Sequence, residues 1–145
     1  MSQVTVTRHI EAPVQKVFQT VSNIEGFSKA VPHIVEVEFL SETRSGVGAR
    51  FRETRMMGGR KASTVLEVTE YVENERVRLV SDAGGTIWDS VFSVEREGGG
   101  TILKLTMDAK PYKFLQKFLV PLMMKGFMTK ALSADMDAVK EYCET

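Results

Sequence analysis

Two residues of opposite charge, Glu53 and Arg55, stand two positions apart in a stretch that alternates as a β-strand does. Side chains two residues apart point to the same face of a strand, so Phe51, Glu53, Arg55 and Met57 share one face. Burying a carboxylate and a guanidinium among apolar side chains is costly unless the two are paired or reached by water. The spacing therefore predicts a polar, wet end to an otherwise apolar cavity.

This pair has two interpretations. In the first, the Arg55 guanidinium donates hydrogen bonds to a carboxylate or enolate oxygen, and Glu53 is a hydrogen-bond acceptor or general base. Both are then candidate catalytic residues. In the second, the two charges simply neutralise each other at the edge of a sheet. We favour the structural interpretation, because ion pairs are more often structural than catalytic.

Large apolar residues in the other strands complete the expected binding site. We take the face of each strand that carries these large apolar residues as the inner one. The side chains expected to point inward are then Val35, Val37, Phe39, Phe51, Met57, Trp88, Phe92, Val94, Leu103, Leu105 and Met107. The expected ligand-binding residues are Phe39, Phe51, Glu53, Arg55, Met57, Trp88, Phe92, Met107, Met123 and Phe127. Unbranched methionine side chains suit a flexible apolar ligand, but they fill protein cores equally well, and the sequence leaves both roles open.

The elements that must position these side chains form a sheet and a few helices. Alternating apolar residues separated by short turns predict strands over 3–10, 35–39, 48–57, 61–72, 76–82, 86–96 and 101–108. Glycine-rich joints such as 58–59, 84–85 and 98–100 indicate tight hairpins and hence an antiparallel meander.

Helical spacing appears in three places. An apolar stripe at i, i+3, i+4 and i+7 predicts a short helix that begins at Pro13, and Asn23 is expected to cap a second one that ends before Pro32. After Pro111 a helical stripe runs for roughly 30 residues. A proline inside a helix removes a hydrogen bond and bends the axis, so we expect a kink or break near Pro121.

The order of these elements resembles the helix-grip fold of the START and birch-pollen-allergen superfamily. Within it, the chain is similar to the bacterial polyketide cyclase/dehydrase and lipid-transport group in three segments, 4–18, 47–51 and 131–140. The resemblance implies an α+β fold in which a curved, seven-stranded, mostly antiparallel sheet grips a long C-terminal helix, with two short helices after the first strand. It also implies an interior cavity, on a scaffold that serves lipids, polyketides, hormones and peptides alike.

Two groups of basic residues have a functional and a structural interpretation. The first group consists of six basic residues between residues 44 and 61, a stretch that contains one acid, Glu53. They are Arg44, Arg50, Arg52, Arg55, Arg60 and Lys61. We favour cross-strand ion pairs with the neighbouring glutamates over anion recognition. Lys113, Lys117, Lys125 and Lys130 accompany the apolar stripe over 114–128, which is the composition of a membrane-surface helix. Here we favour packing of the stripe on the sheet, and transient membrane contact stays open.

Composition excludes several classes of protein. The 145 residues suit one domain over 1–145, and 19 basic against 19 acidic residues give no general attraction to nucleic acid. One cysteine, Cys143, excludes a disulfide framework, and we expect a cytoplasmic protein with no stable membrane insertion. Isolated His9 and His33 lack metal-ligand spacing, and no residue pattern requires a metal or organic cofactor.

Three functions remain. The first is binding of one small hydrophobic molecule, lipid-like, polyketide-like or aromatic, with its polar end near Glu53 and Arg55. The second is a cyclase, aromatase or dehydratase that uses the same cavity and the same two residues. The third is a protein-interaction module, which predicts a filled interior.

Overall fold

A computed structural model describes residues 2–145, except that the side chains of Ser2 and Lys125 lie outside the described part. It contains one antiparallel sheet of seven strands in the order β1-β7-β6-β5-β4-β3-β2. The strands are β1 (Ser2–Ile10), β2 (Ile34–Phe39), β3 (Arg50–Met57), β4 (Arg60–Val72), β5 (Arg76–Ala83), β6 (Thr86–Glu97) and β7 (Gly100–Pro111). All seven predicted strands are confirmed.

The helices also lie where the apolar spacing predicts them. They are α1 (Val14–Ser22), α2 (Ile24–Ala30), α3 (Phe114–Met123), the π-helical turn η1 (Met124–Met128) and α4 (Thr129–Glu144). Asn23 caps α2 as expected, because its side-chain oxygen accepts a hydrogen bond of 2.7 Å from the backbone N–H of Gly26.

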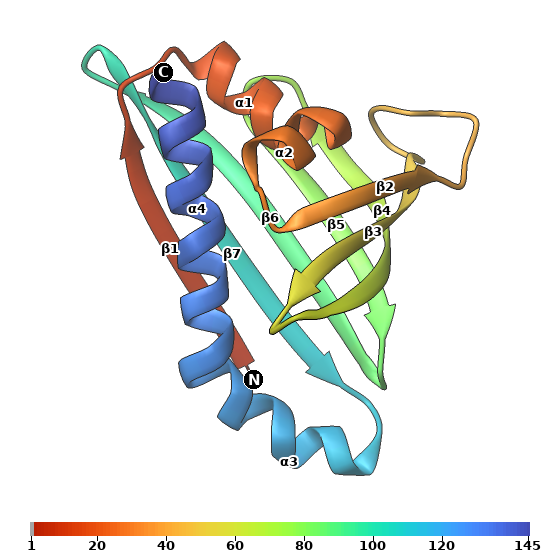
Figure 1. The fold of residues 1–145 in the computed structure, drawn as a ribbon. Coiled ribbons are helices and arrows are strands. Elements are labelled where there is room, and N and C mark those ends of the chain that lie inside the picture. Colours follow the sequence, from red (N-terminus) through yellow and green to blue (C-terminus); the bar gives the residue numbers. More distant parts are fainter. Residues whose placement is uncertain (1) are drawn as a thin grey trace.

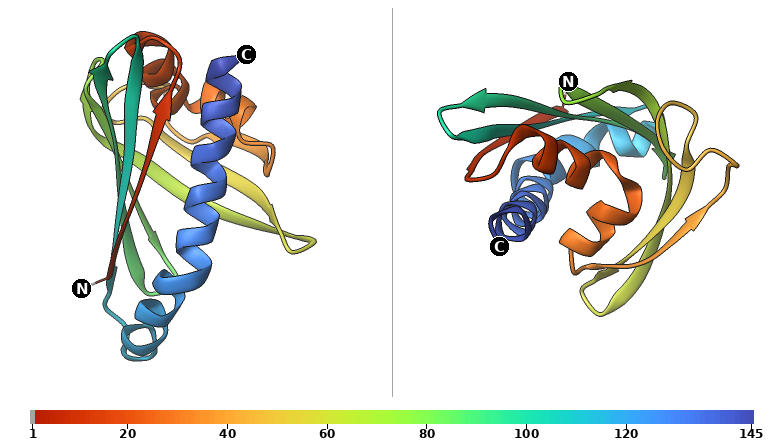
Figure 2. Two further views of the ribbon diagram at one scale, coloured as in Figure 1. Left: turned by 90° about the vertical axis from the view of Figure 1, so that its left-hand side faces the viewer. Right: turned by 90° about the horizontal axis from the view of Figure 1, so that it is seen from above.

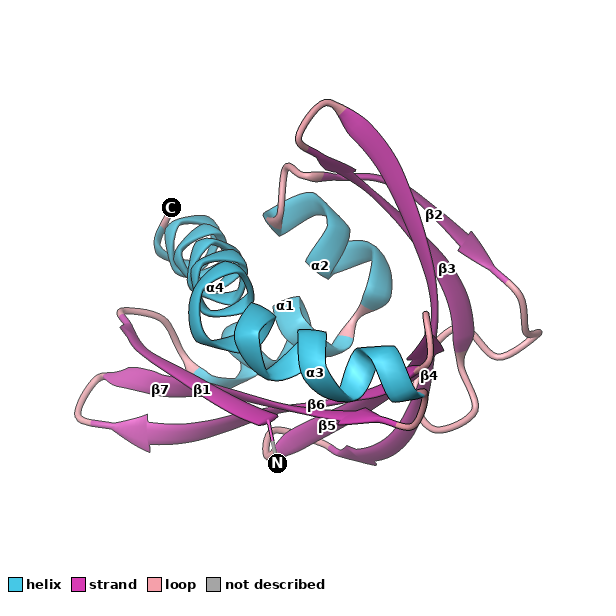
Figure 3. Cartoon of the chain, turned by 90° about the horizontal axis from the view of Figure 1, so that it is seen from below, coloured by secondary structure: helices cyan, strands magenta, loops and turns pink. Residues whose placement is uncertain are grey.

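The sheet curls round the helices in the expected helix-grip arrangement (Figure 1). α4 packs along β1 at one end of the sheet, and the strands from β4 to β2 bend away from it (Figure 2). α1 and α2 fill the upper end of the space between them, and α3 crosses the lower end (Figure 3). The fold class is α+β, as predicted.

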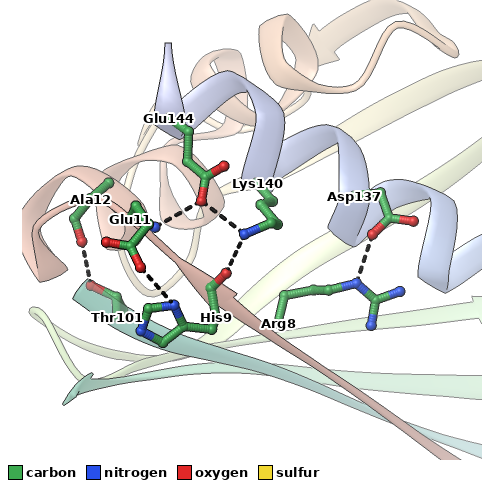
Figure 4. Close-up of polar contacts among 8 residues, drawn as sticks. All are labelled: Arg8, His9, Glu11, Ala12, Thr101, Asp137, Lys140 and Glu144. Atoms are coloured by element: carbon green, nitrogen blue, oxygen red, sulfur yellow. Dashed lines mark hydrogen bonds and ion pairs between the residues drawn. The ribbon is translucent and has the colours of Figure 1, made fainter. Parts of the chain in front are cut away.

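Polar contacts hold the upper half of α4 against β1 (Figure 4). Lys140 donates to the backbone oxygen of His9 at 2.6 Å and to Glu144 at 2.8 Å, and Glu144 also accepts from the backbone N–H of Glu11 at 2.8 Å. Lower down, Arg8 pairs with Asp137 at 2.7 Å. These contacts fix the helix that forms one wall of the molecule.

A deeply buried apolar core lies where α1 and α4 meet the sheet. Val17, Phe18, Leu103, Met136 and Val139 are almost completely buried there. Apolar burial at this end supplies most of the driving force that places α4 over the sheet.

The long C-terminal helix breaks slightly later than predicted. Pro121 lies inside α3, and the π-helical turn η1 follows three residues after it, before α4 starts in a new direction (Figure 1). In this wider turn the backbone carbonyl of Met124 accepts a hydrogen bond of 2.8 Å from the Thr129 hydroxyl. The continuous rod suggested by the stripe is therefore a short helix joined at an angle to a longer one.

The prediction that Val35 points inward is wrong. The pairing of β2 with β3 shifts between Ile34 and Glu36, so that Ile34 is buried and Val35 is 48% exposed. One extra residue in a strand turns the side chains before it to the other face. Strict alternation across 35–39 cannot reveal such a bulge.

Candidate functional site

A cavity of about 460 Å³ lies between the concave face of the sheet and the helices. This volume is within the range of pockets that hold small molecules. Its apolar wall comes from β3 to β7, from α1 and α2 at one end, and from α3, η1 and the first turn of α4 at the other: Val21, Ile24, Phe27, Phe51, Met57, Leu66, Leu79, Ala83, Trp88, Phe92, Leu105, Met107, Met123, Phe127, Met128, Ala131 and Leu132. The interior is hollow, which does not match the filled core expected of a pure interaction module.

The cavity exists because the middle of the concave face carries small side chains. Ser90 lies between Leu79 of β5 and Met107 of β7 in the strand register, and Ser81 lies opposite Trp88. α4 packs over β1 at the end of the sheet and so does not reach these central positions. A curved sheet with small central residues leaves a space that no described side chain fills.

Three charged side chains form a polar cluster on the cavity wall. Arg55 donates through Nε to Glu53 at 2.6 Å and through Nη1 to Asp135 of α4, with a closest approach of 2.9 Å. The side chains of Glu53, Arg55 and Asp135 are 13%, 25% and 8% exposed. The cluster thus ties β3 to α4 at the edge of the cavity.

Burial and mutual attraction set the charges of this cluster. Burial opposes the charged form of Arg55, but the nearby carboxylates of Glu53 and Asp135 outweigh it and raise the pKa of Arg55. Burial also raises the pKa of Asp135 above its ordinary value, and the attraction of Arg55 only partly offsets this. Asp135 is therefore the carboxyl of this site that holds a proton more readily than an exposed aspartate.

Sequence reasoning missed Asp135 and Ser81, which both line the cavity. Asp135 interrupts the apolar stripe of the last helix next to Met136, and an acid in such a position was the available signal. Ser81 is buried, and among the described side chains its hydroxyl has no hydrogen-bond partner. A buried, unpaired hydroxyl on a cavity wall is a natural contact for a polar ligand atom.

Nine of the ten residues expected to bind a ligand line the cavity: Phe51, Glu53, Arg55, Met57, Trp88, Phe92, Met107, Met123 and Phe127. Phe39 does not. It lies on the edge strand β2 opposite Phe51, packs against the core, and has the guanidinium of Arg44 4.7 Å from its ring centre. An edge position with a cation over the ring keeps Phe39 away from the cavity.

A second hollow, of about 340 Å³, opens beside the polar cluster. Arg55, Met57, Phe127, Ala131 and Asp135 line both spaces. The ion pair between Arg55 and Asp135 therefore stands where the main cavity meets this outer hollow.

The basic stretch over 44–61 divides into separate contacts. Arg52 forms the expected cross-strand ion pair with Glu38 on the outer face. Arg55 turns inward, and Arg44 stacks on Phe39. The cross-strand interpretation is confirmed for Arg52.

The favoured interpretation of the 114–128 stripe is wrong for α3. Its large apolar residues face outward, and Phe114, Phe118 and Leu122 are 78%, 62% and 74% exposed. Val120 is the buried residue of α3, and it packs with Met124 against Ala109. Because Pro121 and η1 turn the helix away from the line of α4, the stripe crosses the end of the molecule instead of lying on the sheet.

The described residues carry neither a metal cluster nor a membrane-spanning helix. Over these residues no three His, Cys, Asp or Glu side chains gather as a metal site would require. In the part of the chain that the structure describes, no helix has both the length and the apolar character needed to cross a membrane.

Solved structures with the same fold come from several kinds of protein. A START superfamily protein from Mycobacterium smegmatis is 18% identical with a TM-score of 0.78, and the match covers 99% of this chain and 98% of that one. A protein from Thermus thermophilus is 21% identical with a TM-score of 0.77, covering 96% and 94%. The di-domain ARO/CYC StfQ from the steffimycin biosynthetic pathway is 8% identical with a TM-score of 0.81, covering 99% of this chain and 51% of that one. At such identities these matches show the fold.

The family is shown by the sequence itself. No curated protein matches the chain. The model of the family described as polyketide cyclase / dehydrase and lipid transport matches residues 1–144, which is nearly the whole sequence. Together with the helix-grip fold and its cavity, this match means that the chain belongs to the polyketide cyclase/dehydrase and lipid transport family.

Proposed function

We propose that the protein binds one small hydrophobic molecule, lipid-like, polyketide-like or aromatic, in the cavity between the sheet and the C-terminal helix. The observation that carries this proposal is a largely apolar cavity of about 460 Å³ with one polar cluster on its wall. Sites for small molecules combine these two features, since apolar walls give affinity and a few polar groups fix orientation. The methionines at 57, 107, 123 and 128 supply a wall that adapts to a flexible ligand.

The polar cluster favours a neutral ligand head over an anionic one. Arg55 already donates to two carboxyl groups, so the cluster holds more negative than positive charge unless Asp135 is protonated. A ligand carboxylate would meet this excess and would have to displace an existing ion pair. A hydroxyl or another hydrogen-bond donor can instead bond to Glu53 or Asp135, with Ser81 as a further partner.

The direct test is to purify the protein, measure its mass under native conditions and extract it with organic solvent. We expect a carried-over molecule that is apolar over most of its length and lacks a carboxylate. A fluorescent probe of the same kind, such as a pyrene-labelled alcohol, then gives an affinity. A pyrene-labelled acid of equal chain length should bind more weakly.

A matched pair of variants on β6 locates the binding. Ser90→Phe places a ring in the cavity, whereas Ser93→Phe places the same ring on the outer face of the same strand. We expect Ser90→Phe to weaken probe binding at least about tenfold, because one displaced large apolar group is worth about 1.5–3 kcal/mol. Ser93→Phe should leave it unchanged. Equal effects of both variants, or no binding of either probe by the parent protein, would contradict the proposal.

A second candidate is an enzyme of the cyclase, aromatase or dehydratase type. The observation in its favour is Asp135, a buried carboxyl of raised pKa that faces the cavity and touches Arg55. A carboxyl that holds its proton can act as a general acid towards a leaving hydroxyl. If Asp135→Asn abolishes turnover of a polyketide-like substrate but keeps its affinity, the protein is an enzyme; binding without turnover in the parent protein supports a carrier.

We also infer a cytoplasmic location. Cys143 is a free thiol, buried and in contact with the Thr20 hydroxyl at 3.4 Å, and a reducing compartment keeps such a thiol unmodified. Fractionation of cells that express the natural protein would test this location.

A further inference from the structure

The outer face of α3 is an apolar surface that no described part of the chain covers. Phe114, Leu115, Phe118, Leu119 and Leu122 share this face at i, i+1, i+4, i+5 and i+8, and each of them is at least 49% exposed. Phe114 and Phe118 pack edge to face, so the two rings form a continuous ridge. Exposed apolar patches of this kind mark surfaces that bind a protein partner or a lipid layer.

The charges around this ridge favour a lipid layer. Residues 109–134 contain five lysines and neither Asp nor Glu, although the whole chain has 19 acidic residues. Three of these lysines are exposed: Lys113 directly before α3, Lys117 within it, and Lys130 at the start of α4. An apolar helix face flanked by lysines is complementary to an anionic bilayer surface, where the rings enter the acyl region and the ammonium groups meet the headgroups.

The surface is also continuous with the cavity. Met123, Phe127 and Met128, at the end of α3 and in η1, line the cavity, and Met123 and Phe127 are also 36% and 56% exposed. α3 crosses the lower end of the molecule (Figure 3), and Met123, Phe127 and Met128 form the part of the cavity wall that continues from this helix. A membrane that contacts α3 therefore lies next to the cavity.

We propose that the apolar face of α3, together with its flanking lysines, docks on the surface of an anionic membrane. The helix lies in the plane of the interface, with the ridge of Phe114, Phe118 and Leu122 buried among the lipids. Docking does not depend on the identity of a cavity ligand. Exchange of that ligand between bilayer and cavity is a further step, and it rests on the proposed function.

Vesicle flotation tests the docking. The probes are vesicles of phosphatidylcholine alone and vesicles of phosphatidylcholine with phosphatidylglycerol, both without any cavity ligand. We expect the protein to float with the anionic vesicles, and to release when salt is raised, because surface electrostatics are screened by ions. The double variant Phe118→Gln/Leu122→Gln should lose about tenfold or more in partition, since two large apolar groups no longer enter the lipid.

Matched variants separate the surface from general effects. Val47→Gln removes an apolar side chain that is 62% exposed, as Phe118 is, but lies in the loop between β2 and β3, so it should float like the parent protein. Lys117→Gln and Lys130→Gln should each weaken binding to anionic vesicles about fivefold. Lys104→Gln removes the same charge from an exposed position on β7 and should have no such effect.

The results distinguish this proposal from the function proposed above. Neither Phe118 nor Leu122 lines the cavity, so probe binding in vesicle-free solution should survive the double variant. Flotation without probe binding refutes the ligand proposal and keeps the docking. Absence of flotation, or equal flotation of the parent protein and the double variant, refutes the docking. The docking is also refuted if light scattering shows that the parent protein is a dimer and the double variant a monomer, because a second copy then covers the ridge.

Discussion

Replacing Arg55 with methionine should destabilise the protein mainly by leaving two carboxyl groups without their cation. Arg55 contacts Glu53 at 2.6 Å and Asp135 at 2.9 Å, and both acids are largely buried. Methionine keeps much of the length and apolar volume of the side chain. The change therefore removes the charge and its hydrogen bonds while filling most of the space.

Two considerations set the expected size of the loss. Breaking a buried ion pair costs about 3–5 kcal/mol, and the 25% exposure of Arg55 reduces this because water screens part of the interaction. Protonation limits the cost for each carboxyl: one of ordinary pKa 3.8 can be neutralised at pH 7 for about 4 kcal/mol, at 1.36 kcal/mol per pH unit. We expect a loss of about 2–4 kcal/mol in the free energy of unfolding.

The loss should shrink as the pH falls. Without Arg55, burial and the nearby Glu53 carboxylate raise the pKa of Asp135 in the folded state with no cation to offset them, so the folded protein binds more protons than the unfolded one above the ordinary value of 3.8. The stability of Arg55→Met relative to the parent protein then increases as the pH falls from 7 towards 3.8, the ordinary pKa of aspartate. Urea unfolding followed by tryptophan fluorescence at several pH values measures this, with Trp88 as the reporter.

Two further variants make the result decisive. Arg52→Met removes the exposed pair with Glu38 on the same strand and should cost less than about 1 kcal/mol. Adding Asp135→Leu to Arg55→Met should recover most of the stability, because it removes the more buried of the two carboxyl groups. If Arg55→Met stays within about 0.5 kcal/mol of the parent protein at neutral pH, the cluster is not a structural ion pair and this reasoning fails.

Two shorter predictions concern other polar groups. Ser81→Ala should leave stability unchanged or raise it by up to about 1 kcal/mol, because the buried hydroxyl has no described partner, while the affinity for a hydroxyl-bearing probe falls; a clear loss of stability in thermal unfolding would contradict this. Arg78→Gln should lower Tm by about 2–4 °C at neutral pH. The hydrogen bond from Arg78 lowers the pKa of Asp89, so the stabilisation by this pair is lost when Asp89 becomes protonated. The deficit in Tm should therefore vanish as the pH falls below 3.8, the ordinary pKa of aspartate. A deficit that persists in acid would show that the pair contributes through packing alone.

The strands and helices could be predicted because apolar residues recur at a regular spacing within each of them. Alternation placed all seven strands, and Asn23 and Pro32 marked the limits of the second helix. The inward direction of Glu53 and Arg55 followed from the same rule, since residues 51, 53, 55 and 57 share a face of β3 with no bulge.

The structural features that could not be predicted depend on contacts between distant segments of the chain. The partner of Arg55 on α4 lies 80 residues away, and no local pattern indicates that distance. The orientation of α3 depends on where η1 turns the chain, so the same apolar stripe that predicts burial in a straight helix is exposed in a bent one. The bulge at Val35 likewise arises from pairing with β3 and not from the residues of β2 alone.

The start of β1 and the end of α4 lie at opposite ends of the molecule (Figure 1). β1 begins close to α3, whereas α4 ends beside α1, where Lys16 donates to the backbone oxygen of Thr145 at 3.3 Å. An affinity tag or a surface tether joined after Thr145 would hold the protein with α3 and the hollow interior facing the solution. A fusion partner joined ahead of β1 would crowd that same region, so any immobilised binding assay is best built from the carboxyl terminus.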